Sequence, residues 1–299
     1  MKILILGSSG FIGKSLIKDL PDSIGVSLRS NNWNERFKCA DVIINLVGKA
    51  HDHKGMATQE DYYYANVALL KNIFEEYIKS KASLFIHISS LAAVEEYESI
   101  HPLDENAICY PISLYGISKR VAEEWLLNQA LPEGKKLIIV RPPMVHGPGD
   151  KGNLGLLYSL ISKGIPYPLA SFTNSRSFIS IGNFNFFIKQ IIEKKEMLLS
   201  GIYHVADDES ISTNDIITVI KTVTEKKVPN VSLPKFLING LAKMGDFLPI
   251  PLNTKRLKKM TSSLLVSNKK IKNALGIQKL PFTAKEGLEI TIKSFNQTK

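Results

Sequence analysis

In the N-terminal half of the chain, short continuous apolar runs alternate with stretches in which apolar residues recur at helical spacing. Residues 3–6 (ILIL) form such a run and end at Gly7, which is typical of a strand buried on both faces of a sheet. Residues 11–20 carry apolar side chains on related faces of a helix. Further strands are expected at 25–28, 41–48, 84–90 and 136–143, and further helices at 60–81 and 113–131. This alternation predicts βαβ units and an α/β fold built on a doubly wound parallel sheet.

The pattern becomes less regular in the second half. The segment RPPMVHGPGDKGN, residues 141–153, is rich in Pro and Gly and is expected to form a loop. Ser212 and Asp215 have the spacing of a capping box, which marks the start of a helix. The elements expected here are a helix at 154–164, a strand at 201–207, a helix at 212–223 and a less regular helical tail from about residue 228.

The composition is that of an ordinary globular protein, with 299 residues, 44% hydrophobic and 22% charged. No apolar run in the sequence reaches the 18 residues that a membrane span needs. The opening run at 3–6 is too short for the apolar core of a signal peptide. The two cysteines, Cys39 and Cys109, form no disulfide framework and no Cys-x-x-Cys metal motif, which favours a reducing compartment. We therefore expect a cytoplasmic protein.

The net charge of +10 comes from lysines that are spread thinly along the chain, with only small clusters. A scattered excess of this kind is typical of a solvated surface. It favours a small polyanion through its summed field, and no nucleic-acid partner is expected. His51 and His53 flank Asp52, but no other ligand cluster with suitable spacing accompanies them in the sequence, so no metal is expected.

The segment GSSGFIG, directly after the first expected strand, predicts a dinucleotide-binding loop. Gly7 permits a tight turn, Gly10 lets a pyrophosphate approach the backbone, and Gly13 allows a helix to pack closely on the strand. The N-terminus of the helix that follows offers free N–H groups and a positive dipole end to the phosphates. The alternative is a strand–helix turn without a ligand, but the flanking strand and helix supply the context that the binding motif requires.

The end of the second expected strand indicates which dinucleotide is bound. An acidic residue there would accept the ribose hydroxyls of NAD, whereas an arginine suits the 2′-phosphate of NADP. Arg29 and Ser30 stand at this position, and no Asp or Glu occurs between Gly25 and Asn34. NADP is therefore the expected cofactor. NAD is the alternative, and an ordinary surface arginine is the simpler explanation of Arg29.

Five segments together carry a family resemblance: GSSGFIG, DVIINLVGKAH, FIHISS, YGISK and RPPMVHGPGD. In this order and approximate spacing they resemble the extended short-chain dehydrogenase/reductase family, the NAD(P)-dependent nucleotide-sugar epimerases, dehydratases and reductases. The resemblance covers nearly the whole chain and implies a homodimer. Together with the change of pattern, it predicts a dinucleotide-binding Rossmann domain at 1–165, with a return segment at about 178–210. A smaller, interwoven substrate-binding domain is expected at 166–177 and 211–299.

Tyr115 and Lys119 lie one turn apart on one face of the helix expected at 113–131. By itself such a pair often occurs by chance, but in register with the other segments it matches the family's catalytic tyrosine and lysine. An ammonium near a phenol, whose ordinary pKa is about 10, favours the phenolate and lets it exchange a proton at neutral pH. The resemblance implies that Ser90, or less favourably Ser89, is the hydroxyl that holds the reacting substrate oxygen.

Further site residues follow from the resemblance alone. Arg176 matches an arginine that grips the substrate diphosphate, for which a guanidinium is a bidentate donor, with a surface ion pair as the alternative. Asn153 matches an asparagine that contacts the nucleotide diphosphate. The implied cofactor contacts are Gly7, Ser9, Gly10, Phe11, Ile12, Gly13, Arg29, Leu46, Tyr115, Lys119 and Pro142. His146 stands where the family usually carries a tyrosine and is assigned no role.

The residues after Ser90 discriminate between reactions. Leu91 and Ala92 cannot supply the additional acid and base that eliminating water requires, which argues against a 4,6-dehydratase. We predict NADP-dependent reduction of a 4-keto nucleotide-diphosphate hexose, of the UDP-N-acetylhexosamine type, in the synthesis of surface polysaccharide sugars. The alternatives are an NAD-dependent UDP-hexose 4-epimerase, which uses the same three residues, and a non-enzymatic Rossmann sensor or RNA-binding relative. A lipid-linked sugar diphosphate is a further candidate substrate.

Overall fold

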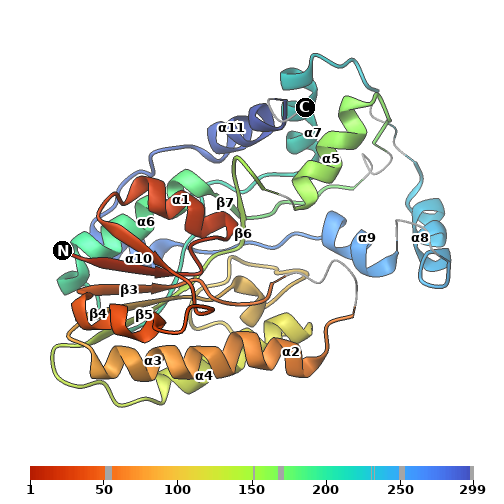
Figure 1. The fold of residues 1–299 in the computed structure, drawn as a ribbon. Coiled ribbons are helices and arrows are strands. Elements are labelled where there is room, and N and C mark those ends of the chain that lie inside the picture. The colour runs from red at the N-terminus through yellow and green to blue at the C-terminus, as the bar shows by residue number, and fades with distance from the viewer. Residues whose placement is uncertain are drawn as a thin grey trace.

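The computed structural model describes residues 1–50, 56–150, 152–167, 172–229, 231, 233–248 and 253–296. At its centre is a parallel sheet of six strands in the order β2-β1-β3-β4-β5-β8 (Figure 1). The strands are β1 (Ile3–Leu6), β2 (Ser23–Val26), β3 (Val42–Asn45), β4 (Leu84–Ile88), β5 (Lys136–Arg141) and β8 (Gly201–His204). The strand order reverses at β1, because β2 and β3 lie on either side of it. The predicted α/β fold with a doubly wound parallel sheet is therefore confirmed.

The strands are apolar throughout because helices cover both faces of the sheet. In β1, Ile3 and Ile5 belong to one hydrophobic core, whereas Leu4 and Leu6 belong to the other. The first core is closed by α1 (Phe11–Asp19), α6 (Ile181–Glu193) and α10 (Lys269–Leu275), and the second by η1 (Trp33–Cys39), α3 (Leu69–Lys79) and α4 (Leu114–Leu127). Figure 1 shows α1 and α6 above the sheet and α3 and α4 below it.

The C-terminal half adds a separate hydrophobic core, which lies at the right of Figure 1. Its helices are α5 (Asn153–Ser162), α7 (Thr213–Thr224), α8 (Lys235–Met244), α9 (Thr254–Thr261) and α11 (Ala284–Asn296). Beside it, β6 (Met144–His146) pairs in parallel with β7 (Phe178–Ser180). The chain passes into this core, returns to the sheet through α6 and β8, and then enters the core again. The predicted domain boundaries remain a prediction.

The helix expected at 60–81 is present but not uniform. It consists of α2 (Gln59–Tyr63), a π-helical turn η2 (Tyr64–Ala68) and α3, and it begins at a capping box between Thr58 and Asp61. The π turn widens the helix by an extra residue and buries Asn66. The predicted capping box between Ser212 and Asp215 is confirmed as the start of α7.

The prediction of a loop over 141–153 is wrong at its centre, where β6 forms. Its pairing partner, β7, is more than thirty residues later in the chain. Proline and glycine content describes only local preferences, and here a distant strand supplies the hydrogen bonds that the local sequence lacks. The remaining short elements are η3 (Leu91–Ala93) and η4 (Lys195–Met197).

Candidate active site

The glycine-rich turn between β1 and α1 has the geometry of a phosphate cradle. Gly7 has a φ of +80°, and a Cβ atom there would lie 3.0 Å from the carbonyl carbon of Leu46. Gly10 is the N-cap of α1 without a side-chain cap, and the first turn of the helix carries no acidic residue. The N–H groups at this helix end are therefore open to an anion. The turn fits the pyrophosphate of a dinucleotide.

Gly13→Ala is expected to weaken NAD(P)H binding by about tenfold or more, since the strain of a displaced backbone amounts to about 1–3 kcal/mol. A Cβ atom at Gly13 would lie 2.5 Å from the oxygen of Gly7 and 2.6 Å from the Cα of Ser8, so the cradle would have to shift. Binding is measured by titrating the fluorescence of the reduced dinucleotide. Gly155→Ala is the matched control, because its Cβ would meet only Phe295, at 4.0 Å. A Gly13→Ala protein that binds as tightly as the parent contradicts the cradle.

An open cleft of about 500 Å³ lies beside this turn, lined by Ser8, Ser9, Lys14, Ile17, Lys18 and Gly25. Lys14 and Lys18 place two exposed ammonium groups on α1. Arg29 is exposed in the turn that follows β2, the strand next to β1. These cations follow the carboxyl ends of neighbouring parallel strands, where nucleotides bind in folds of this class. Their charges suit a phosphate group.

The strand β4 and the helix α4 bring the three expected catalytic residues together. Ser90 follows Ser89 after the end of β4 and caps η3, where its hydroxyl accepts a hydrogen bond from the N–H of Ala92 at 3.2 Å. Tyr115 and Lys119 lie on α4, and the side chains of Tyr115 and Ser90 are hydrogen-bonded to each other. The Lys119 ammonium donates to the carbonyl of Ile88, the last residue of β4, over 3.0 Å. All three side chains thus meet at the carboxyl end of β4.

The segment that follows β3 connects the phosphate turn with Lys119. At one end its backbone packs against Gly7. At the other end Gly48 approaches so closely that a Cβ atom there would lie 3.3 Å from Nζ of Lys119. Asn66 holds this segment, since its side chain accepts from the N–H of Lys49 at 2.8 Å and donates to the carbonyl of the same residue at 3.1 Å. A ligand that follows the carboxyl edge of the sheet from the phosphate turn therefore reaches the Tyr–Lys pair.

Burial dominates the electrostatics of the pair. It lowers the pKa of Lys119 to about 8, and the carboxylate of Glu123 acts in the opposite direction. It also raises the pKa of Tyr115, although the hydrogen bond with Ser90 opposes this change. The expected lowering of the Tyr115 pKa is therefore wrong. The phenolate would lose more hydration in the buried site than its neighbours return, and the Lys119 ammonium is directed at the carbonyl of Ile88.

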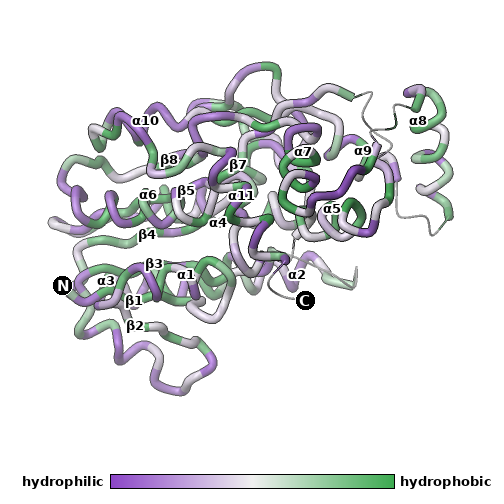
Figure 2. The backbone as a smooth tube through the Cα atoms, turned by 90° about the horizontal axis from the view of Figure 1, so that it is seen from above, coloured by the Kyte–Doolittle hydropathy of each residue, from purple (hydrophilic) through white to green (hydrophobic). Residues whose placement is uncertain are grey.

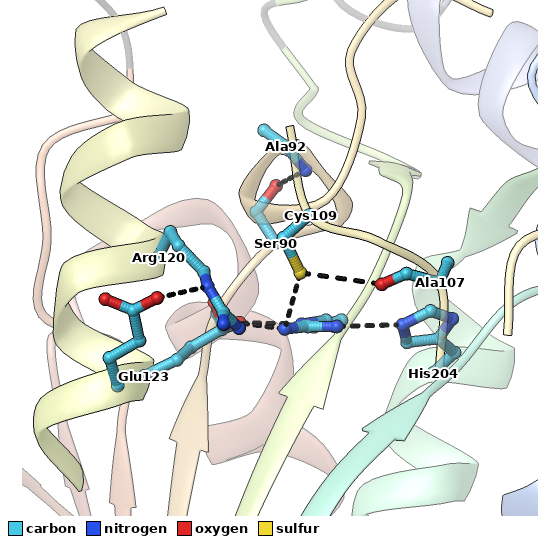
Figure 3. A network of polar contacts seen from close by, with 10 residues as sticks. Ser90, Ala92, Ala107, Cys109, Arg120, Glu123 and His204 are labelled. Atoms are coloured by element: carbon cyan, nitrogen blue, oxygen red, sulfur yellow. Dashed lines mark hydrogen bonds and ion pairs between the residues drawn. The ribbon is translucent and has the colours of Figure 1, made fainter. Parts of the chain in front are cut away.

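A buried polar network supports the site from behind (Figure 3). Arg141, at the end of β5, donates to both carboxylate oxygens of Glu123 on α4, over 2.8 and 2.6 Å. Ser89, the neighbour of Ser90, also donates to this carboxylate. Both charged side chains are at most 1% exposed, and the guanidinium also contacts His204 and the sulfur of Cys109. The network ties β4, β5, β8 and α4 to one another.

A cavity of about 340 Å³ opens beside Tyr115, lined by Ala50, Ala57, Tyr62, Glu96, Ser113, Leu114, Tyr115 and Lys259. Lys259 comes from α9, so the C-terminal core contributes a cation to a cavity that otherwise belongs to the sheet domain. Glu96 lies 3.7 Å from this ammonium and accepts the N–H of Ser113, at the start of α4, over 2.7 Å. The cavity therefore lies between Tyr115 on α4 and Lys259 on α9.

The sequence profile described as the NAD dependent epimerase/dehydratase family matches residues 3–206. The chain belongs to this family. It is thus an NAD(P)-dependent enzyme of the nucleotide-sugar epimerase and reductase group, which confirms the resemblance found in the sequence.

Several relatives of this family member match it along nearly its whole length. UDP-glucose 4-epimerase from Vibrio cholerae is 28% identical, over 99% of this chain and 95% of the relative. The N-acetyl-alpha-D-glucosaminyl-diphospho-ditrans,octacis-undecaprenol 4-epimerase of Escherichia coli O157:H7 is 25% identical, over 97% and 94%. The structure of UDP-glucuronic acid 4-epimerase from Bacillus cereus in complex with NAD has a TM-score of 0.77 at 18% identity, over 99% of both chains. The fold is therefore shared in full.

A reductase and a structure in complex with NADPH are similar to this chain as well. The dTDP-4-dehydro-6-deoxyglucose reductase of Escherichia coli is 24% identical, over 75% of this chain and 82% of the relative. The structure of RMD from Pseudomonas aeruginosa complexed with NADPH has a TM-score of 0.72 at 16% identity, over 99% of both chains. Proteins with this fold thus bind either dinucleotide.

Of the two residues expected to bind substrate only, the structure describes the side chain of Arg176 but only the backbone of Asn153. Arg176 donates through Nη1 to the carbonyl of Tyr97 at 3.1 Å and to that of Ser262 at 3.2 Å, so it joins two backbone segments. Burial lowers its pKa to about 10, which leaves the guanidinium charged at neutral pH. Its contact with a diphosphate remains a prediction. The backbone of Asn153 begins α5, but its side chain lies outside the described residues.

His146, to which the sequence assigns no function, is packed in the interior of the protein. His146 is buried and its Nδ1 lies 2.9 Å from the hydroxyl of Thr291, and burial lowers its pKa to about 4. The segment 51–53, considered and discounted as a metal site, lies outside the described residues. Within the described part of the chain, no group of three or more His, Cys, Asp or Glu is arranged to hold a metal ion.

Sequence reasoning missed three residues that shape the site. Glu123 lies four residues after Lys119 on the same helix, and this i, i+4 spacing was a signal that could have been used. Lys259 belongs to the small basic cluster TKRLKKM, which carries no mark of a site in the sequence. Asn66 is buried by the π turn, and the sequence does not predict that turn.

Proposed function

We propose that this chain is a nucleotide-sugar 4-epimerase that inverts the C4 configuration of a UDP-hexose. The observation that carries the proposal is the extent of similarity. The two 4-epimerases match 99% and 97% of the chain, whereas the reductase from Escherichia coli matches 75%. Ser90, Tyr115 and Lys119 suit either reaction, so the site chemistry alone does not separate them. Leu91 and Ala92 argue against elimination of water, as they do in the sequence.

Ser90, Tyr115 and Lys119 each contribute to the transfer of one proton. Tyr115 acts as the base in its phenolate form: the phenolate takes the proton of the C4 hydroxyl, and the phenol so formed later returns it to the same oxygen. Ser90, hydrogen-bonded to Tyr115, holds that oxygen in place and stabilises charge on it. The Lys119 ammonium lies next to Gly48, in the segment that follows β3, and provides the positive charge of the site. A bound nicotinamide supplies the hydride acceptor and donor. The cavity beside Tyr115 gives the 4-keto sugar room to present its other face to the same residues.

The test compares the two reactions on one preparation. Purified enzyme is incubated with UDP-glucose and with UDP-N-acetylglucosamine without added cofactor, and the anomeric NMR signals are followed. Appearance of the 4-epimer supports the proposal. In parallel, UDP-4-keto-6-deoxy-N-acetylhexosamine is supplied with NADPH. Stoichiometric NADPH loss, without interconversion of UDP-hexoses, would overturn epimerisation in favour of reduction.

Reduction of a 4-keto sugar is the second candidate, and Arg29 is the observation that favours it. If Arg29 binds a 2′-phosphate, Arg29→Ala is expected to weaken NADPH binding about tenfold or more and to leave NADH binding unchanged, since a hydrogen bond to a charged group contributes about 1.5–3 kcal/mol. Both affinities are measured by fluorescence titration. Arg36→Ala, another exposed arginine, is the control. Equal affinities of the Arg29→Ala and parent proteins for NADPH would show that Arg29 does not bind a 2′-phosphate and would remove the observation that favours reduction.

The pKa of Lys119 predicts how activity depends on pH. Because this pKa is lowered to about 8, the ammonium is charged below pH 8 and loses its proton as the pH rises through that value. We expect kcat/KM, which reports groups of the free enzyme, to fall on the alkaline side of about pH 8. Lys119→Arg, whose charge persists to higher pH, should remove this limb at a lower overall rate. A flat profile between pH 7 and 9 in the parent would contradict the role of the charge.

A further inference from the structure

The helix α8 and the turn that follows it present large apolar side chains to solvent. On the helix, Phe236 is 71% exposed, and Leu237, Leu241 and Met244 are each about half exposed. In the following turn Phe247 is 91% exposed. We call these residues, together with Leu248, the α8 patch. Single exposed apolar residues need no explanation, but a contiguous group of this kind marks an interaction site.

The surface of α8 has three sides, of which one is apolar and exposed, one is buried and one is polar. Ile238 and Ala242 are buried in the C-terminal core and hold α8 against α9. Lys235, Asn239 and Lys243 recur every four residues and therefore form a polar row along a third side. The apolar sector thus lies between the anchored side and the cationic row. Figures 1 and 2 both place α8 at the periphery of the molecule, and Figure 2 shows its mixed green and purple colouring.

The turn after α8 has a defined conformation. Asp246 accepts hydrogen bonds from the N–H and the hydroxyl of Thr254, at the start of α9, over 3.0 and 2.9 Å. This contact fixes the position of Phe247 relative to the helix. The exposed rings are therefore part of a supported surface.

We propose that the α8 patch docks on the surface of an anionic lipid bilayer. A helix with Phe and Leu on one side and lysines beside them is suited to lie in the plane of the interface, with its apolar side among the acyl chains and its ammonium groups at the phosphates. Lys243 has no ion-pair partner in the described part of the chain. Lys226 and Lys227, exposed in the segment that leads to α8, add to the same positive charge.

The patch lies on the surface and does not span the bilayer. At 1.5 Å per residue, the ten residues of α8 cover roughly half of the ~30 Å hydrocarbon thickness. In the part of the chain that the structure describes, no helix is long and apolar enough to cross a membrane. Docking through α8 would bring α9 towards the membrane, and α9 supplies Lys259 to the cavity beside Tyr115.

A second copy of the chain fits this surface less well than a membrane. Two copies that met through the patch would bring their lysine rows together, and each chain carries a net charge of +10. The predicted homodimer has a different surface available, because Ile117 and Val121 on α4 are exposed as well. An anionic bilayer instead complements both the apolar and the cationic parts of α8.

The test measures sedimentation of the full-length protein with vesicles, which requires no assumption about the reaction. Vesicles of phosphatidylcholine alone are compared with vesicles that contain phosphatidylglycerol. We expect binding to the anionic vesicles, and Phe236→Ser/Phe247→Ser should reduce the bound fraction about fivefold or more. This variant keeps the net charge, so unspecific attraction of a basic protein is the same in both. Ile100→Ser/Ile108→Ser removes two equally exposed apolar side chains elsewhere and is the matched control.

Each result decides for or against the bilayer. Loss of binding in Phe236→Ser/Phe247→Ser, with an unchanged melting temperature and unchanged binding by the control, supports it. Lys235→Glu/Lys243→Glu should then abolish the preference for phosphatidylglycerol. Absence of parent binding to anionic vesicles overturns the proposal, as does equal binding by the parent and the α8 variant. If the α8 variant lowers the molar mass in light scattering, the patch is instead a contact between copies.

Discussion

Tyr115→Phe is expected to lower kcat for 4-epimerisation by about 10²- to 10⁴-fold, the range that a positioned proton-transfer group contributes. The substitution removes one oxygen atom and leaves the ring in place on α4. The oxygen lost is the one that is hydrogen-bonded to Ser90, in a residue that lines the cavity. Turnover is measured by NMR with the UDP-hexose that the parent converts.

Binding measurements keep this loss distinct from a structural effect. NAD(P)H affinity should stay within about twofold of the parent, because the phosphate turn on β1 and α1 is untouched, and a mutation that removes only a transition-state interaction lowers kcat without changing ground-state binding. Tyr110→Phe is the matched control, since Tyr110 is 71% exposed and only five residues earlier in the chain. A Tyr115→Phe enzyme with more than about a tenth of the parent kcat would assign the proton to another group.

Arg141→Met is expected to cost about 3–5 kcal/mol of the free energy of unfolding, because it leaves the buried carboxylate of Glu123 with only the more distant guanidinium of Arg120, 3.8 Å away. The pair is joined by hydrogen bonds of 2.6 and 2.8 Å, and its side chains are 1% and 0% exposed. Removing one charge from such a pair is costly because the other has been taken out of water. Urea-induced unfolding of the parent and the variant gives the difference directly.

The double replacement separates this reason from a simple loss of packing. Arg141→Met/Glu123→Leu removes both charges, and we expect it to be more stable than Arg141→Met alone. Lys79→Gln is the control, because its Nζ lies 2.8 Å from the carboxylate of Glu76 and its side chain is 67% exposed, and surface pairs contribute only about 0–1 kcal/mol. A double variant as unstable as the sum of the two single variants would show that the buried charge is not the cause.

Much of the fold was predictable because its signals are local. A strand buried on both faces needs an unbroken apolar run, and Ile3–Leu6 has one. An amphipathic helix needs a periodic apolar stripe, and the helices that cover the sheet have one. The pairing of β6 with β7 was not predictable, because each strand has only three residues and the partners are far apart in the chain. The π turn at Asn66 likewise leaves no periodic mark.

Some features of the candidate site were likewise predictable from the sequence, and others were not. Gly7 and Gly13 were predictable because a side chain at either position would collide with neighbouring backbone, and Gly10 because it completes the spacing of the motif. Tyr115 and Lys119 were expected to share one face of α4 because of their helical spacing, whereas their roles were implied only by the family resemblance. The direction of the Tyr115 pKa change was not, since it depends on how deeply the folded chain buries the phenol.

The sequence by itself determined how the strands and helices around the sheet follow one another and where the glycine-rich turn lies, because these depend on residues close together in the chain. The roles of Ser90, Tyr115 and Lys119 were implied by the family resemblance and stay a prediction. The tertiary structure alone decided that Glu123 meets Arg141, that Lys259 reaches the cavity beside Tyr115, and that one side of α8 stays uncovered. These features arise from contacts between segments far apart in the chain. Such contacts depend on the packing of the whole molecule, for which no local pattern exists.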